Sequence, residues 1–199
     1  MAQEKAGGLS HATIETNNFL MIVLILLVVA VGGIVEIVPL FFQKSTTEPV
    51  KGVVPYSALQ LMGRDVYIRE GCYNCHSQMV RMVSAEVQRF GERSFSGEFV
   101  YDHPFQWGSK RTGPDLHRVG GKYPDVWHWK HMLDPRETSP GSIMPAYTWL
   151  KDGLVDTAGT KTKLIAMQML GVPYEKSLVD DPMPSMRSQD EAIRTRLKE

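Results

Sequence analysis

The sequence is short of cysteine and has no surplus of charge of either sign. Of its 199 residues only Cys72 and Cys75 are cysteines, and two residues separate them. This excludes a disulfide-stapled secreted scaffold and indicates local chemistry at the two thiols. Lysine and arginine number 22, as do aspartate and glutamate, so the formal net charge is zero. Because nucleic-acid binding needs a basic surplus, no nucleic-acid partner is expected.

Long apolar runs are also scarce, and the chain has one. Residues 19–42 read FLMIVLILLVVAVGGIVEIVPLFF, with Glu36 as the single charge. At about 1.5 Å per residue, a helix of this length reaches roughly 36 Å, enough to cross a hydrocarbon core of about 30 Å. A cleaved signal peptide is the alternative, but the positive n-region is poor and the apolar run continues past the one faint cleavage site. We therefore expect a retained transmembrane helix over 19–42, surrounded by membrane lipid.

Glu36 is an unusual residue for a membrane span. Intramembrane carboxylates usually face a protein interior and find a partner there. The simpler interpretation is that this carboxylate reaches the nearby interface, about 9 Å along the helix. The part of the helix around Glu36 also has small or ring-shaped side chains at Gly32, Gly33 and Pro39. Small residues allow another helix to pack closely. Both interpretations stay open at this stage, and the second implies partners in the membrane.

Residues 72–76 read CYNCH and use both cysteines of the chain. C-x-x-C-H is the attachment signature of c-type haem, in which two thiols add to the haem vinyl groups and the adjacent histidine ligates the iron. A zinc site would need two further ligands at metal spacing, and a thioredoxin-like dithiol expects a βαβ setting; the sequence offers neither. We therefore predict one covalent haem c on Cys72 and Cys75, with His76 as an axial iron ligand.

The haem motif also orients the chain, because haem c is attached on the outer side of energy-transducing membranes. Residues 1–18 should be a short cytoplasmic N-terminus, and residues 43–176 a periplasmic mono-haem cytochrome c domain at a bacterial inner membrane. Residues 177–199 should be a polar C-terminal tail on the surface, with one helical turn or two.

The predicted fold is mainly α: one N-terminal transmembrane helix plus a class I-like cytochrome c domain with a long loop insertion. Helices are expected over 57–71, with Ser57 as N-cap, over 124–133 and over 161–170. Residues 77–109 form the insertion, and its aromatic side chains suit burial against the domain or a partner.

The second axial ligand must come from elsewhere in the chain, which has 11 methionines. Met144 lies in the loop SPGSIMPAYTWL, 68 residues after His76, where the chain can wrap over the distal haem face. Met183 and a second histidine are the alternatives. A methionine ligand would raise the haem potential, whereas a second histidine would lower it. With both axial positions filled by protein, the haem should pass single electrons rather than bind a small molecule.

Two further residues are expected beside the haem. A ligating histidine usually donates its other ring N–H to a carbonyl or carboxylate, and we expect the Pro114 carbonyl to accept this bond from His76. Arg111 is a candidate partner for a haem propionate, and an ordinary solvated arginine is the alternative.

Several stretches carry a resemblance to a known family: GGIVEIVP at the membrane, EGCYNCHSQMVR, GEFVYDHPFQWGSKRTGPDL, RVGG, IMPAYTWL and LGVPY. Over roughly residues 19–175 the chain resembles the mono-haem cytochrome c subunit (subunit II) of the cbb(3)-type, C-type haem-copper cytochrome c oxidases. Met82-Val83 departs from the Pro-Phe pair of that family and leaves the ligands untouched. The resemblance assigns haem attachment to Cys72 and Cys75, and iron ligation to His76 and Met144.

The resemblance implies an electron-transfer subunit of a terminal oxidase that does not itself hold the oxygen site. Its donor would be a di-haem cytochrome c subunit or a soluble cytochrome c, and its acceptor a haem-copper catalytic subunit, which reduces oxygen to water with proton pumping. Residues 97–115 resemble the segment that faces the catalytic subunit, where a structural calcium lies, and Ser109 is the residue expected to approach it. The alternatives are a free-standing membrane-anchored cytochrome shuttle and a tethered haem sensor.

Overall fold

The computed structural model describes residues 11–198, and the chain divides into two compact units, Met1–Glu48 and Pro49–Glu199. The first unit holds, in order, α1 (His11–Thr16), α2 (Asn18–Ile37), the 3-10 helix η1 (Val38–Phe42) and α3 (Lys44–Thr47). Asn17 caps α2, because its side-chain oxygen accepts a hydrogen bond from the Leu20 amide at 3.0 Å.

The stretch Asn18–Phe42 is long and apolar enough to cross a membrane, and it is not buried against the described chain. This confirms the candidate transmembrane helix that the sequence predicted near the N-terminus. Glu36 is exposed on α2, and a Cβ added to Gly32 or Gly33 would meet nothing within 4 Å. The helix thus offers a narrow face of small residues on which another helix can pack closely.

The second unit is helical throughout its regular structure, and the described residues contain isolated β-bridges but no strand. Its α-helices are α4 (Ala58–Arg69), α5 (Ser84–Phe90), α6 (Asp125–Leu133), α7 (Pro135–Thr138), α8 (Thr160–Met169), α9 (Lys176–Asp180) and α10 (Met183–Arg196). Its 3-10 helices are η2 (Cys72–Asn74), η3 (Ser96–Glu98), η4 (Leu116–Arg118) and η5 (Thr148–Lys151). The mainly helical fold class is confirmed, and so are the three helices expected from the sequence, which correspond to α4, α6 and α8.

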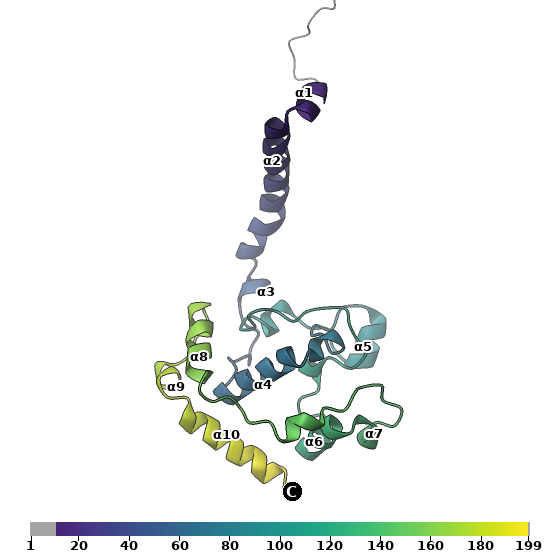
Figure 1. Ribbon diagram of the computed structural model, residues 1–199, viewed down its shortest axis with the longest axis vertical. Helices are drawn as coiled ribbons and strands as arrows, with labels where there is room; N and C mark the ends of the chain where they lie inside the picture. Colours follow the sequence, from purple (N-terminus) through teal and green to yellow (C-terminus); the bar gives the residue numbers. More distant parts are fainter. Residues whose placement is uncertain (1–10, 199) are drawn as a thin grey trace, which may run out of the picture. The chain divides into compact units, whose positions relative to one another are not determined.

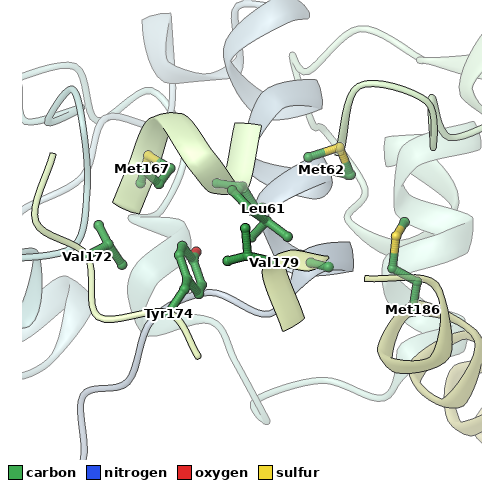
Figure 2. Close-up of a cluster of buried hydrophobic side chains, with 9 residues drawn as sticks. Leu61, Met62, Met167, Val172, Tyr174, Val179 and Met186 are labelled. Atoms are coloured by element: carbon green, nitrogen blue, oxygen red, sulfur yellow. The ribbon is translucent and has the colours of Figure 1, made fainter. Parts of the chain in front are cut away.

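The core of the second unit forms around α4. Leu61 and Met62 of α4, Leu164 and Met167 of α8 and Met186 of α10 all lie in one buried cluster. Figure 2 labels Leu61, Met62, Met167 and Met186 of this cluster together with Val172, Tyr174 and Val179 from the segment between α8 and α10. Figure 1 shows α8, α9 and α10 beside α4. Each fully buried side chain of this size stabilises the fold by about 1.5–3 kcal/mol.

Helix α4 begins as its sequence predicts. The Ser57 hydroxyl accepts from the Gln60 amide at 3.3 Å, and the Gln60 side chain accepts from the Ser57 amide at 2.9 Å. This reciprocal capping box satisfies amides that the first helical turn leaves unpaired. The core cluster and the cap together fix the helix that leads into the CYNCH motif.

The C-terminal segment differs from the polar surface tail that the sequence analysis predicted for 177–199. It forms α9 and α10, and Val179 and Met186 are buried in the core cluster. The Ser57 hydroxyl, at the start of α4, donates to the Gln189 side chain of α10 at 2.6 Å. Polar and charged residues dominate the composition of α10, but Met183, Met186 and Ile193 share one face of the helix. Of this face, Met183 and Met186 pack on the core cluster.

The long insertion over 77–109 is fastened to α4 by a buried ion pair. Arg64 and Asp102 approach to 3.3 Å with side chains 6 % and 3 % exposed, and Arg64 also donates to the carbonyl oxygens of His103 and Pro104. Burial raises the pKa of Asp102, while the Arg64 charge opposes that rise. The insertion is therefore a fixed part of the second unit.

The aromatic side chains of the insertion divide into two groups. Phe99 is buried, and Tyr101 packs against the core cluster. Phe105 and Trp107 are exposed and stack on each other, with ring centroids 4.5 Å apart. The domain thus covers part of this aromatic set and leaves the other part on the surface.

Candidate functional site

The two cysteines lie on a tight turn directly after α4. Gly71 ends the helix in the left-handed conformation, with φ at 70°, which glycine adopts without a steric penalty. Cys72 is half-buried and Cys75 is exposed, and both thiols are free. The His76 amide donates to the Cys72 carbonyl oxygen at 2.8 Å, so a single turn holds all three residues of the motif. Burial raises the pKa of the Cys72 thiol.

The imidazole of His76 is fixed on one side and open on the other. Its Nδ1 lies 2.8 Å from the Pro114 carbonyl oxygen, the contact expected for this pair. Because a carbonyl can only accept, Nδ1 carries the proton and donates it to Pro114. Among the described residues, Nε2 has no hydrogen-bond partner. The ring therefore presents the lone pair of Nε2, which is the form of histidine that binds a metal.

Gly113 packs directly on the His76 ring. A Cβ added there would lie 2.6 Å from Nδ1 and 2.8 Å from Nε2 of His76. No side chain fits in that space, so the loop can approach the ring only because this position is glycine. The sequence analysis did not single out Gly113, although its place next to Pro114 in a Gly/Pro loop was the available signal.

Tyr67 holds the backbone of the motif from the α4 side. Its hydroxyl donates to the His76 carbonyl oxygen at 2.7 Å. Burial raises the pKa of Tyr67, so the hydroxyl stays protonated and keeps donating. The sequence analysis did not single out Tyr67, because this bond joins the helix to the chain nine residues later and leaves no local signal.

The side chain of Arg111 is buried, and its guanidinium is bound to nearby backbone carbonyls. Its side chain is 7 % exposed, and its guanidinium donates to the carbonyl oxygens of the three residues that follow His76, namely Ser77, Gln78 and Met79. Its Nε lies 3.9 Å from the Glu86 carboxylate. The solvated alternative is therefore wrong, and a haem propionate would have to compete with three backbone acceptors.

The loop that carries Met144 is tied to the same region. Trp149 donates its indole N–H to the Glu70 carboxylate at 3.1 Å, and Glu70 is the residue after α4. Burial raises the pKa of Tyr147, and Cys72 and Cys75 contribute to the rise. Met144 itself is half-buried, and its amide donates to the Ser142 hydroxyl at 3.2 Å.

Met183 and two of the histidines have other contacts. Met183 begins α10 and packs against the core cluster. His117 contacts the Glu98 carboxylate at 3.0 Å, and His131 contacts the Thr138 hydroxyl at 2.6 Å. Thiols, an open imidazole nitrogen and a thioether are the kinds of donor that a c-type haem takes. In their chemistry, the residues present therefore fit this group.

The described residues do not fit a calcium site by themselves. Ser109 is exposed, and among the described side chains there is no group of three His, Cys, Asp or Glu residues that could hold a metal ion. Calcium takes six to eight oxygen ligands. Ser109 would supply one of them, so the rest would have to come from outside this chain.

Comparison with known protein families gives one match over nearly the whole chain. Residues 11–199 match the family described as the cytochrome c oxidase mono-haem subunit, FixO. A search of curated proteins finds no match. The family match covers the membrane helix, the CYNCH turn, the Met144 loop and α10.

Proposed function

The chain belongs to the FixO family of mono-haem cytochrome c oxidase subunits, and from this premise we propose that it is the electron-transfer subunit of a cbb(3)-type terminal oxidase. One haem c would be attached to Cys72 and Cys75. His76 and Met144 would ligate the iron. The haem supplies one-electron redox chemistry when bound.

The observation that carries the proposal is the state of the His76 ring. Its Nδ1–H is committed to the Pro114 carbonyl, and Gly113 closes one face of the ring. This leaves Nε2 as a preorganised ligand atom, four residues after the first thiol. The Nδ1–H bond orients the ring and raises the basicity of the ligating nitrogen. Tyr67 and Arg111 hold the backbone on which the ring sits.

We propose that the subunit itself does not bind oxygen. If protein fills both axial positions, no open coordination site remains, and oxygen must be reduced in the haem-copper catalytic subunit. The electron donor would be a di-haem cytochrome c subunit or a soluble cytochrome c. A calcium ion at the interface with the catalytic subunit would take one oxygen from Ser109 and its other ligands from that subunit.

The proposed location is the bacterial inner membrane. Residues 19–42 would span it once, with the N-terminus in the cytoplasm and the haem domain in the periplasm, where haem c is attached. The family match and the single apolar helix support an anchored subunit. Glu36, Gly32 and Gly33 would then face a helix of the catalytic subunit.

The test is to purify the complex in a mild detergent through a tag on this chain. We expect a haem c band and haem b bands in the reduced-minus-oxidised spectrum, together with cyanide-sensitive oxygen uptake. A single haem c without oxygen uptake, after gentle extraction, would favour the shuttle instead. Cys72→Ala with Cys75→Ala should abolish haem staining of this chain in a denaturing gel, since both thioether bonds are then absent.

A further inference from the structure

Asp115 is a buried carboxylate in the loop that holds His76, and the ligation described above does not use it. The residue is 0 % exposed and directly follows Pro114. Its Oδ1 accepts a hydrogen bond from the His117 amide at 2.9 Å, which caps the start of η4. Its Oδ2 is also buried and has no hydrogen-bond partner among the described residues. Burying such an oxygen costs free energy, and a neutral capping side chain would avoid that cost.

The carboxylate of Asp115 is close to the imidazole of His76, because a single peptide bond separates it from the carbonyl that binds the ring. The Pro114 carbonyl oxygen lies 2.8 Å from Nδ1 of His76, and the same peptide bond contains the nitrogen of Asp115. Standard bond lengths across a planar trans peptide keep the carboxylate carbon of Asp115 within about 5 Å of that oxygen. The carboxylate therefore lies within about 8 Å of Nδ1, whatever the side-chain rotamer.

Positive charges balance the buried carboxylate. Three cations line one pocket together with Asp115, namely Arg89, Arg118 and Lys122. Arg118 also donates to the Glu98 carboxylate at 2.9 Å. Buried charges in proteins are paired with charges of opposite sign, because an isolated charge is very costly to bury. The pocket supplies this compensation, so the fold can hold Asp115 as a charged group.

We propose that the buried negative charge of Asp115 lowers the midpoint potential of the haem held at His76; this rests on the proposed function. Ferric iron carries one positive charge more than ferrous iron, so a fixed negative charge nearby favours the ferric state. The attraction acts at nearly full strength because burial keeps water and salt away from Asp115. One electron leaves the ferrous haem of a donor protein and reduces the ferric haem of this chain, with no bond formed or broken and no proton moved. The lower potential makes the reduced haem a better donor to the next cofactor.

The experiment removes the charge and keeps the cap. Asp115→Asn retains a side-chain oxygen that can accept from the His117 amide, but the side chain is neutral. A redox titration of the haem-loaded, full-length chain measures the midpoint potential. We expect the potential to rise: at a fixed solution potential the ferrous-to-ferric ratio should increase roughly tenfold, which is about 59 mV for one electron.

The direction of the shift separates this role from a structural one. If Asp115 only held the loop, its substitution would loosen the haem site and weaken the methionine ligand, and the potential would fall. Asp115→Ser removes the same charge but has a shorter side chain with different hydrogen bonding. It should therefore raise the potential by the same amount as Asp115→Asn.

Asp134→Asn is the matched control. The Oδ1 of Asp134 caps α7 in the same way, by accepting from the Arg136 amide at 3.0 Å, but the residue is exposed. Because water and salt screen an exposed charge, this variant should change the potential far less than Asp115→Asn.

An unchanged or lower potential in Asp115→Asn would overturn the proposal, as would an equal rise in Asp134→Asn. A rise that Asp115→Ser does not share would overturn it too, because a displaced loop would then be the cause. If neither variant at position 115 retains haem, the carboxylate is a structural group, which also contradicts the proposal. Absence of covalent haem in the unmutated chain would instead contradict the proposed function, and this proposal with it.

Discussion

At the scale of single residues, the imidazole of His76 is oriented by neighbours of different chemistry. The Pro114 carbonyl accepts its Nδ1–H, Gly113 packs on its face, and Tyr67 binds its backbone carbonyl. Each neighbour comes from a segment that is remote in the sequence or on the far side of the turn. The ring therefore has one orientation in the folded chain, whatever the cysteines bind.

Replacing Gly113 with alanine should disturb the ligand directly. The added Cβ would overlap the His76 ring, so the loop or the ring must move, at a cost of about 1–3 kcal/mol. We expect less haem-loaded protein and a lower melting temperature. Gly120→Ala is the control, because a Cβ there meets nothing within 4 Å. Equal haem yields from the two variants would contradict the packing argument.

The proposal that Met144 is the second axial ligand can be tested by substituting Met144 and, as a control, Met183. Met144→Ala should leave the haem covalently attached, because the thioether bonds do not involve this residue, but it should lower the midpoint potential. The ferric sulfur-to-iron absorption at the red end of the spectrum should also disappear. Met183→Leu, at the alternative position in the core, should keep both properties. An unchanged potential in Met144→Ala would exclude Met144 as the ligand.

At the scale of elements, the polar composition of residues 183–196 did not predict that they form α10, a helix that packs on the core. Its outer face is charged, and its inner face places Met186 against α4 with 4 % of the residue exposed. Because α10 closes the core beside the helix that leads into the haem motif, its packing stabilises the position of the thiols.

Truncating Met186 should therefore unfold the domain more easily. Met186→Ala is expected to reduce the free energy of unfolding by about 2–5 kcal/mol, the usual loss for a buried methionine. Met169→Ala, at a position that is 84 % exposed on α8, should change it very little. Chemical denaturation of the haem-loaded variants measures both, and similar losses would show that α10 is peripheral.

The elements that could be predicted from the sequence are those with local signals. Ser57 and Gln60 mark the start of α4, and the apolar run marks the candidate transmembrane helix. The CYNCH spacing marks the turn proposed to carry the haem. The bond between Trp149 and Glu70 has no local signal, because 79 residues separate the partners. The contacts of Arg111 could not be predicted for the same reason, because its acceptors are backbone carbonyls, which every sequence contains.

At the scale of the whole molecule, the two compact units have separate physical tasks. The first presents an apolar helix, and the second holds its own core and the CYNCH turn. A chain that starts at Pro49, exported behind a cleavable signal peptide, should therefore fold, stain for haem and remain soluble. It should no longer co-purify with membranes. Loss of haem in this shortened chain would show that the second unit depends on the first.

Under the proposed function, the contacts of Arg111 have a consequence for the speed of electron transfer. Each turnover changes the iron charge by one, and the surrounding dipoles and bonds must readjust each time. A guanidinium bound to three successive carbonyls after His76 leaves that backbone little freedom to shift. The reorganisation energy should therefore be small, and an electron can arrive and leave at a modest driving force without waiting for the protein to move.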